Sequence, residues 1–357
     1  MIKAAPVIHE MKSKPADFDV RICLTSQHKD MLDQMLGFFE ITPDYDLNIM
    51  QPGQTLFDVS TKCLTGLEPV VEDFKPDMVA VIGDTTSALM GCIASLYNKI
   101  KIIHIEAGLR SGQKYAPFPE EMNRIMISHM ADYHFAPTEE ARQNLQKEGL
   151  SKNVFVVGNT VIDALRDAVG VVRQENEMYR KIFSEIDFSK KIILVTCHRR
   201  ENFGEPIRNI FKALQSIAEN YNDVQLVFPV HPNPSVGKLA HEMLTGYKNI
   251  FLTDPLGYAE FVWIMDASYF IITDSGGVQE EAPTLQKPLL VLRDVTERPE
   301  LVKLGISKLV GSDTQTIVQA AGELLTNKDV YNTMKGKDNP YGDGTAAHKI
   351  VSTLLDS

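Results

Sequence analysis

The chain has 357 residues, of which 44% are hydrophobic and 23% charged, a composition typical of a globular protein. Its formal net charge of −11 argues against a nucleic-acid-binding surface, because such surfaces usually carry an excess of basic residues. The four cysteines lack the spacing of a zinc site or a disulfide framework, and no apolar run approaches the roughly 18 residues that span a bilayer. We therefore expect a cytoplasmic protein with no metal ion, no nucleic acid and no membrane among its partners.

Short apolar runs alternate with longer amphipathic stretches along the chain, a pattern typical of parallel sheets that carry helices on both faces. A first series of predicted strands comprises Val20–Leu24, Met78–Ile82, Ile102–Ile105, Tyr133–Phe135 and Val154–Val157. A second series comprises Ile192–Val195, Val224–Pro229, Ile250–Leu252, Tyr269–Ile272 and Leu289–Leu292. Helices are predicted between them, for example at His28–Phe39, Thr85–Tyr97, Glu120–Met130 and Pro206–Tyr221.

These strands are too many for one open sheet, so the sequence predicts an α/β protein with two domains that divide within Val161–Lys190. We place an N-terminal domain at residues 1–162 and a second domain at residues 163–341. The sequence Asn-Pro-Tyr-Gly-Asp-Gly at residues 339–344 is a loop signal, and a helix is predicted after it at Ala346–Leu355. We expect residues 342–357 to return to the first domain.

Carboxylates follow two strands of the first series, at Asp84 and Glu106. Asp84 could simply cap the next helix, and Glu106 could form a surface salt bridge. Two carboxylates at equivalent strand ends nevertheless favour one shared ligand site, because open α/β sheets bind ligands at the carboxyl ends of their strands. Glu120 begins a later helix, where acidic residues are also ordinary helix-start chemistry.

Histidines and glycines follow strands of the second series. His198 precedes two arginines, a combination that suits phosphate binding or acid–base chemistry but also occurs in solvated loops. His231 lies between prolines after the next strand. In Asp274-Ser275-Gly276-Gly277 a strand leads into a helix expected at Val278–Leu285, and glycines there suit a tight turn and the approach of a phosphate to backbone amides.

Nine motifs in a fixed order carry a resemblance to a known family. They are GDTT, HIEAGLRSG, PFPEEMNR, GNTVIDAL, CHRREN, PVHPNP, TDSGGVQEEAP, RDVTERPE and NPYGDG. Together they resemble the non-hydrolysing UDP-N-acetylglucosamine 2-epimerases along nearly the whole chain. The resemblance implies the GT-B architecture, in which two Rossmann-like doubly wound domains face a cleft, and usually a homodimer.

The resemblance also implies an activity: reversible epimerisation of UDP-GlcNAc to UDP-ManNAc, in the biosynthesis of cell-surface polysaccharides. UDP is eliminated to give 2-acetamidoglucal and is then added back, with no NAD or other cofactor. Proton transfer and charge stabilisation are implied for Asp84, Glu106, Glu120 and His198. Substrate contacts are implied for Lys3, His231, Phe261, Ser275, Gly276, Gly277, Glu281 and Arg298, with Glu281 on the ribose and Phe261 near the uracil. Some members bind a second, activating UDP-GlcNAc, and Gln27 and Gln54 fit that site.

The start of the chain departs from the family pattern. Family members begin with a strand and G-T-R-P-E, whereas this chain begins Met1-Ile2-Lys3-Ala4-Ala5-Pro6. We therefore expect the first domain to lack an inner strand and a phosphate-binding arginine, and an inactive UDP-sugar-binding remnant is one alternative. A hydrolysing 2-epimerase that releases ManNAc and UDP is a second. A GT-B glycosyltransferase is a third, but it leaves the three carboxylates and His198 unexplained.

Overall fold

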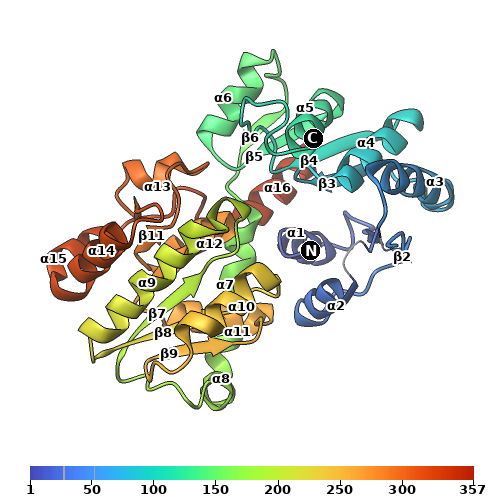
Figure 1. Cartoon of the computed structure of the whole chain (residues 1–357). Coiled ribbons are helices and arrows are strands. Elements are labelled where there is room, and N and C mark those ends of the chain that lie inside the picture. The colour runs from blue at the N-terminus through green and yellow to red at the C-terminus, as the bar shows by residue number, and fades with distance from the viewer. Residues whose placement is uncertain (27–28, 52) are drawn as a thin grey trace. The chain divides into compact units, whose positions relative to one another are not determined.

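The computed structural model describes residues 1–26, 29–51 and 53–357, and it divides the chain into two compact units (Figure 1). The first unit comprises Met1–Ala164 and Tyr341–Ser357, and the second comprises Leu165–Pro340. Among the described residues every strand ladder is parallel. The predicted α/β class with parallel sheets is therefore confirmed.

The first unit contains a four-stranded sheet in the order β3-β4-β5-β6 and a separate ladder of β1 with β2. Its strands are β1 (Cys23–Leu24), β2 (Tyr45–Asp46), β3 (Met78–Ile82), β4 (Lys101–Ile105), β5 (Tyr133–Ala136) and β6 (Val154–Val156). Its helices are α1 (Ala5–Lys12), α2 (Lys29–Phe38), α3 (Leu56–Phe74), α4 (Thr86–Tyr97), α5 (Glu120–Met130), α6 (Glu139–Lys147) and α16 (Ala346–Leu355). The chain passes to the second unit through α7 (Thr160–Gln174).

Apolar side chains cover both faces of this four-stranded sheet, because successive residues of a strand point to opposite faces. Ile102 belongs to a buried cluster with residues of α3, α4 and α5. Its neighbour Ile103 belongs to a second cluster that includes Val7 of α1 and Ile350 of α16. Helices from the two ends of the chain thus pack together on one face, as Figure 1 shows for α1 and α16. Each buried side chain of this size stabilises the fold by about 1.5–3 kcal/mol.

The second unit contains a six-stranded sheet in the order β12-β11-β10-β7-β8-β9. Its strands are β7 (Lys191–Thr196), β8 (Val224–Pro229), β9 (Ile250–Thr253), β10 (Phe270–Thr273), β11 (Leu289–Val291) and β12 (Ser307–Leu309). Its helices are α8 (Asn176–Ile182), α9 (Glu205–Asn220), α10 (Pro234–Leu244), α11 (Tyr258–Ala267), α12 (Gly276–Glu281), α13 (Pro299–Lys303), α14 (Thr314–Thr326) and α15 (Lys328–Lys335), with short 3-10 turns at η1 (Arg200–Asn202) and η2 (Ala282–Leu285). The order reverses between β7 and β10, and such a reversal marks the ligand-binding crevice of doubly wound sheets.

Three details differ from the prediction. The strands β2 and β12 were not predicted, because two or three residues are too few to show an apolar alternation. The helix expected at Val278–Leu285 is also wrong in its bounds, since α12 begins at Gly276 and gives way to η2, which has a proline in its first turn.

Within the residues that the structure describes, no helix combines the length and the apolar character needed to cross a membrane.

Candidate active site

Asp84 and Glu106 lie at the carboxyl ends of the neighbouring strands β3 and β4. Both strands end in left-handed backbone, at Gly83 (φ +69°) and at Glu106 itself (φ +66°), a conformation uncommon for a residue with a side chain. The Gly83 N–H donates to the carbonyl of Ile105 at 3.0 Å, which ties the two strand ends together. A Cβ atom on Gly83 would lie 3.2 Å from Oε2 of Glu106, so the carboxylate packs against bare backbone next to Asp84.

Asp84 is held by two residues of α5. Arg124 donates to Oδ2 of Asp84 through Nε at 3.0 Å and Nη2 at 2.5 Å, and the side chain of Asn123 donates to its backbone carbonyl at 2.9 Å. Burial raises the pKa of Asp84 above its usual value, Arg124 opposes that rise, and the charges of Glu106 and Glu120 add to it. Glu106 and Glu120, the other two predicted catalytic carboxylates, are therefore near enough to affect the ionisation of Asp84. Asn123 and Arg124 were not predicted as site residues, although both are part of the PFPEEMNR motif.

Glu106 has two polar partners at one of its carboxylate oxygens. Its Oε1 accepts hydrogen bonds from Lys3 and, at 3.2 Å, from the side chain of Asn159, while Oε2 faces Gly83. The Glu106 side chain is 11% exposed, so these contacts replace much of its water. The structure thus brings Lys3, predicted to bind substrate, together with a predicted catalytic residue.

Glu121, next to the predicted Glu120, is the more buried of the two glutamates. Its side chain is almost fully buried, and its oxygens accept hydrogen bonds from the N–H groups of Ser111 at 2.9 Å and Gly112 at 3.0 Å. It also lies 3.3 Å from Nη1 of Arg124. Glu121 therefore fastens the loop before α5, whereas Glu120 is only half-buried at the first position of that helix.

In the second unit, Asp274 links the ends of β7 and β10, the two strands at the reversal of strand order. Its carboxylate is fully buried and accepts hydrogen bonds from the N–H groups of His198 at 2.9 Å and Arg199 at 2.8 Å. The side chain of Asn202 donates to it at 2.9 Å. Asp274 therefore fixes the backbone that carries His198. It was part of a quoted motif but was not predicted as a site residue.

The imidazoles of His198 and His231 stack, with ring centroids 5.3 Å apart and planes inclined by 15°. Nδ1 of His198 lies 3.5 Å from Oδ1 of Asp274, and His231 accepts a hydrogen bond at Nδ1 from the Asn233 N–H at 3.1 Å. Burial lowers the pKa of His198, although Asp274 opposes this shift. A neutral His198 therefore predominates at pH 7.

The glycines after β10 do not form the tight turn that the sequence suggests. Gly276 and Gly277 lie in α12, after the N-cap residue Ser275, and neither has a positive φ. Gly276 instead makes room for Arg298, since a Cβ atom there would lie 3.1 Å from Cζ of the guanidinium. Arg298 donates to Oε1 of Glu280 at 3.0 and 2.5 Å. The prediction of a tight turn at these glycines is therefore wrong. The side chain that approaches the bare backbone of Gly276 closely is that of Arg298.

The other predicted residues are placed as follows. Glu281 is buried at the end of α12, and Phe261 is half-buried on α11. Gln54 accepts a hydrogen bond from the Gln51 N–H at 3.1 Å, and Gln27 lies outside the described residues. The roles of all these residues stay predictions.

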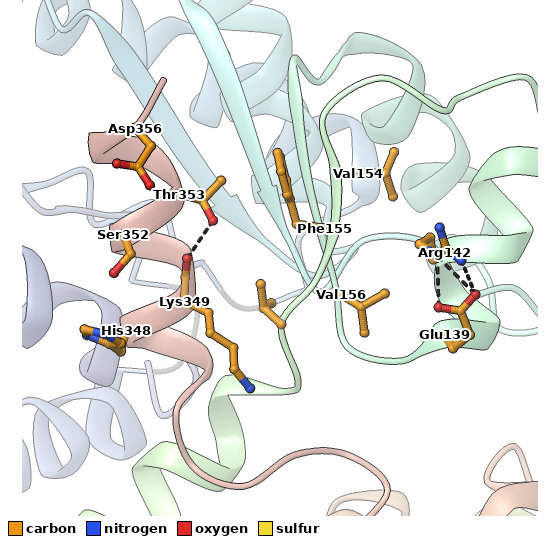
Figure 2. A pocket seen from close by; sticks show the side chains of 11 residues that line it. Glu139, Arg142, Val154, Phe155, Val156, His348, Lys349, Ser352, Thr353 and Asp356 are labelled. Carbon is orange, nitrogen blue, oxygen red and sulfur yellow. Dashed lines mark hydrogen bonds and ion pairs between the residues drawn. The ribbon is translucent and has the colours of Figure 1, made fainter.

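A groove of about 670 Å³ lies between β6 and α16 in the first unit (Figure 2). Val154, Phe155 and Val156 line it from the strand, and His348 and Lys349 line it from the helix. None of the predicted site residues lines this groove. The groove is therefore separate from the strand ends that carry Asp84 and Glu106.

Comparison with known proteins gives consistent matches over the whole chain. A family model described as UDP-N-acetylglucosamine 2-epimerase matches residues 9–355. A Yersinia pestis protein named UDP-N-acetylglucosamine 2-epimerase is 49% identical over 357 residues, which cover 99% of this chain and 95% of the relative.

Solved structures agree with that match. The structure of UDP-GlcNAc 2-epimerase from Neisseria meningitidis bound to UDP-GlcNAc has a TM-score of 0.92 and 46% identity, and the match covers 100% of this chain and 96% of that one. A co-structure of S. aureus MnaA with UDP has a TM-score of 0.87 and 43% identity, covering 99% of this chain and 92% of that one.

Proposed function

The chain belongs to the UDP-N-acetylglucosamine 2-epimerase family, and from that premise we propose that it interconverts UDP-GlcNAc and UDP-ManNAc. The observation that carries the proposal is the placement of Asp84 and Glu106 at two adjacent strand ends, where Glu106 and Glu120 help to raise the pKa of Asp84. Inverting the second carbon of the sugar requires the removal of an unactivated proton and its return on the opposite face. A group of carboxylates in which the pKa of one, Asp84, is raised suits that task.

In the proposed reaction the bond from C2 to hydrogen and the bond from C1 to the diphosphate oxygen both break. The proton passes to an enzyme group, UDP leaves with the bonding electrons, and 2-acetamidoglucal forms. A proton then adds to C2 on the other face, and the diphosphate oxygen adds back to C1. Burial raises the pKa of Asp84, which suits a carboxyl that must both accept and return a proton.

The second unit is proposed to bind UDP. Ser275, Gly276, Gly277 and Arg298 would contact the diphosphate, for which a guanidinium is well suited. Glu281 would accept hydrogen bonds from the ribose hydroxyls, and Phe261 would lie near the uracil. His198 and His231 would line the diphosphate pocket. Lys3, paired with Glu106 in the first unit, would supply a further positive charge to the substrate.

Some broader properties rest on the family resemblance alone. We propose a homodimer, a cytoplasmic location, a role in cell-surface polysaccharide biosynthesis, and a second UDP-GlcNAc site that includes Gln27 and Gln54. Light scattering after size exclusion tests the dimer. Sigmoidal dependence of the rate on UDP-GlcNAc concentration, lost in Gln54→Ala, tests the second site.

Solvent isotope exchange tests the reaction itself. The protein is incubated with UDP-GlcNAc in deuterium oxide, and the products are followed by proton NMR. We expect UDP-ManNAc and re-formed UDP-GlcNAc, both with deuterium at C2, because the proton exchanges while it resides on the enzyme. Epimerised product that keeps protium at C2 would exclude the elimination mechanism. Free ManNAc with UDP would favour the hydrolysing alternative, and binding of UDP-GlcNAc without turnover would favour the inactive remnant.

A further inference from the structure

Two buried histidines lie side by side in the first unit, on adjacent strands and in direct register. His104 of β4 pairs with His134 of β5, and both side chains are almost fully buried. Nε2 of His104 lies 2.9 Å from the carbonyl oxygen of Gly83, and Nε2 of His134 lies 2.8 Å from that of Ser128. A carbonyl oxygen can only accept a hydrogen bond, so both Nε2 atoms carry a hydrogen. Within the described residues neither Nδ1 atom has a hydrogen-bond partner.

Neither histidine is placed to exchange a proton with a substrate. The pKa of His104 is lowered to about 4, mainly by burial and to a smaller extent by His134 and Arg110, whereas the Gly83 carbonyl and Glu106 oppose the shift. Burial lowers the pKa of His134 as well. Both rings are therefore neutral at pH 7, and each serves as a fixed N–H donor to one backbone carbonyl.

What distinguishes the two histidines is the carbonyl that each one holds. Gly83 immediately precedes Asp84, and each of the two peptide groups that flank it is held by a hydrogen bond. The Gly83 N–H, in the peptide before it, donates to Ile105, and the Gly83 carbonyl, in the peptide that joins it to Asp84, accepts from His104. Gly83 has left-handed backbone, and the orientation of the peptide between Gly83 and Asp84 sets the direction in which the chain enters Asp84. His134 holds Ser128, which lies in the later turns of α5 and is not next to a predicted catalytic residue.

We propose that His104 is a positioning residue for the reaction, because its N–H fixes the peptide from which Asp84 projects beside Glu106. The inference rests on the proposed function. The inference adds to the proposed function a residue, His104, that does not touch the substrate but determines where the carboxylate of Asp84 lies. A displacement of about 1 Å at a reacting group can cost on the order of 100-fold in rate, so a small rotation of the Gly83 peptide has a large effect.

Three variants of His104 separate positioning from packing. His104→Gln can bring an amide N–H close to the place of Nε2, His104→Asn offers the same amide too far from Gly83, and His104→Leu offers none. We expect kcat to fall roughly 10- to 100-fold in the Leu and Asn variants, with KM changed less than about 3-fold, and to recover to within about 5-fold in His104→Gln. The matched variants His134→Leu and His134→Gln should lower the melting temperature but leave kcat within about 3-fold of wild type.

Several outcomes would overturn the inference. One is an equal loss of kcat in His104→Leu and His134→Leu. A second is a change in the KM of the His104 variants with no change in their kcat. A third is a folded His104→Gln that is no more active than His104→Asn, and this comparison still tests the inference if a Leu variant does not fold.

A second readout does not depend on epimerase activity. The carboxyl carbon of Asp84 is observed by NMR in aspartate-labelled protein and assigned with Asp84→Asn. The pKa of Asp84 obtained from this titration should change in His104→Asn and should not change in His134→Gln. If wild type proves inactive, this readout alone tests the positioning of Asp84, and an unmoved titration would contradict it.

Discussion

Arg124 donates two hydrogen bonds to a single oxygen of Asp84, Oδ2, at 3.0 and 2.5 Å. Even with this cation in place, burial and the charges of Glu106 and Glu120 raise the pKa of Asp84. The site therefore holds a carboxyl group that gives up its proton less readily than an exposed aspartate does. Such unfavourable placement of charge is typical of catalytic groups.

Asp84→Asn is expected to lower turnover strongly without destabilising the protein at pH 7. A carboxyl whose pKa is raised by folding contributes stability below its unfolded pKa, and that contribution is lost as the pH rises through its folded pKa. The melting temperature of Asp84→Asn should therefore equal or exceed that of wild type at pH 7, and the difference should shrink toward pH 4. The kcat should fall by about 100-fold or more. Calorimetric melts at several pH values and an NMR rate assay measure both effects.

Arg124→Gln is the control for this interpretation. It removes the cation that opposes the pKa rise and leaves Asp84 ionisable, so the variant should be less stable than wild type at pH 7. A melting temperature of Asp84→Asn well below wild type at pH 7 would instead show that the pair with Arg124 outweighs the cost of burying the charge.

Gly276→Ala is expected to weaken UDP binding. The added methyl group would meet the guanidinium of Arg298 at about the 3.1 Å measured from an ideal Cβ atom, so the arginine must move. Losing a charge-assisted hydrogen bond costs about 1.5–3 kcal/mol, which corresponds to roughly 10- to 150-fold in the Kd of UDP. Titration calorimetry with UDP measures the change.

Gly170→Ala in α7 is the matched control, because it makes the same chemical change in the same unit where no atom lies within 4 Å. It should leave the Kd unchanged and stabilise the helix by about 0.5–1 kcal/mol. Equal UDP affinity in both variants would mean that Arg298 does not contact the diphosphate.

The sequence predicted those elements whose signals are local. The bounds of β3, β8, α5 and α16 agree with the structure, since each is a long enough apolar or amphipathic run with clear limits. The strand ends that carry Asp84 and Glu106 followed from the same pattern, because a carboxylate directly after an apolar run lies at the edge of the sheet.

Residues that act across long stretches of chain could not be predicted in this way. Asp274 accepts hydrogen bonds from backbone about 75 residues away, and Glu121 caps amides in a loop about ten residues before it. In the sequence, His104 is one residue of a predicted buried strand, and nothing in that pattern indicates its hydrogen bond to the Gly83 carbonyl. In each case the signal is a tertiary hydrogen bond, which leaves no periodicity in the sequence.

His198→Ala is expected to lower kcat by about 100-fold, the usual scale for the loss of an acid–base or hydrogen-bonding group. Burial lowers the pKa of His198, so near pH 7 the neutral ring would serve the diphosphate as an N–H donor. His198→Gln keeps an N–H donor and should recover part of the rate.

The pH profile tests the same role of His198. If the neutral ring is the active form, the rate in wild type falls as the pH drops through the lowered pKa, below 6.5, and this limb disappears in His198→Gln. The exposed His241 of α10 supplies the control, and His241→Ala should behave as wild type. A folded His198→Ala with wild-type kcat would show that the residues after β7 form only a solvated loop, in which Asp274 serves to hold the backbone.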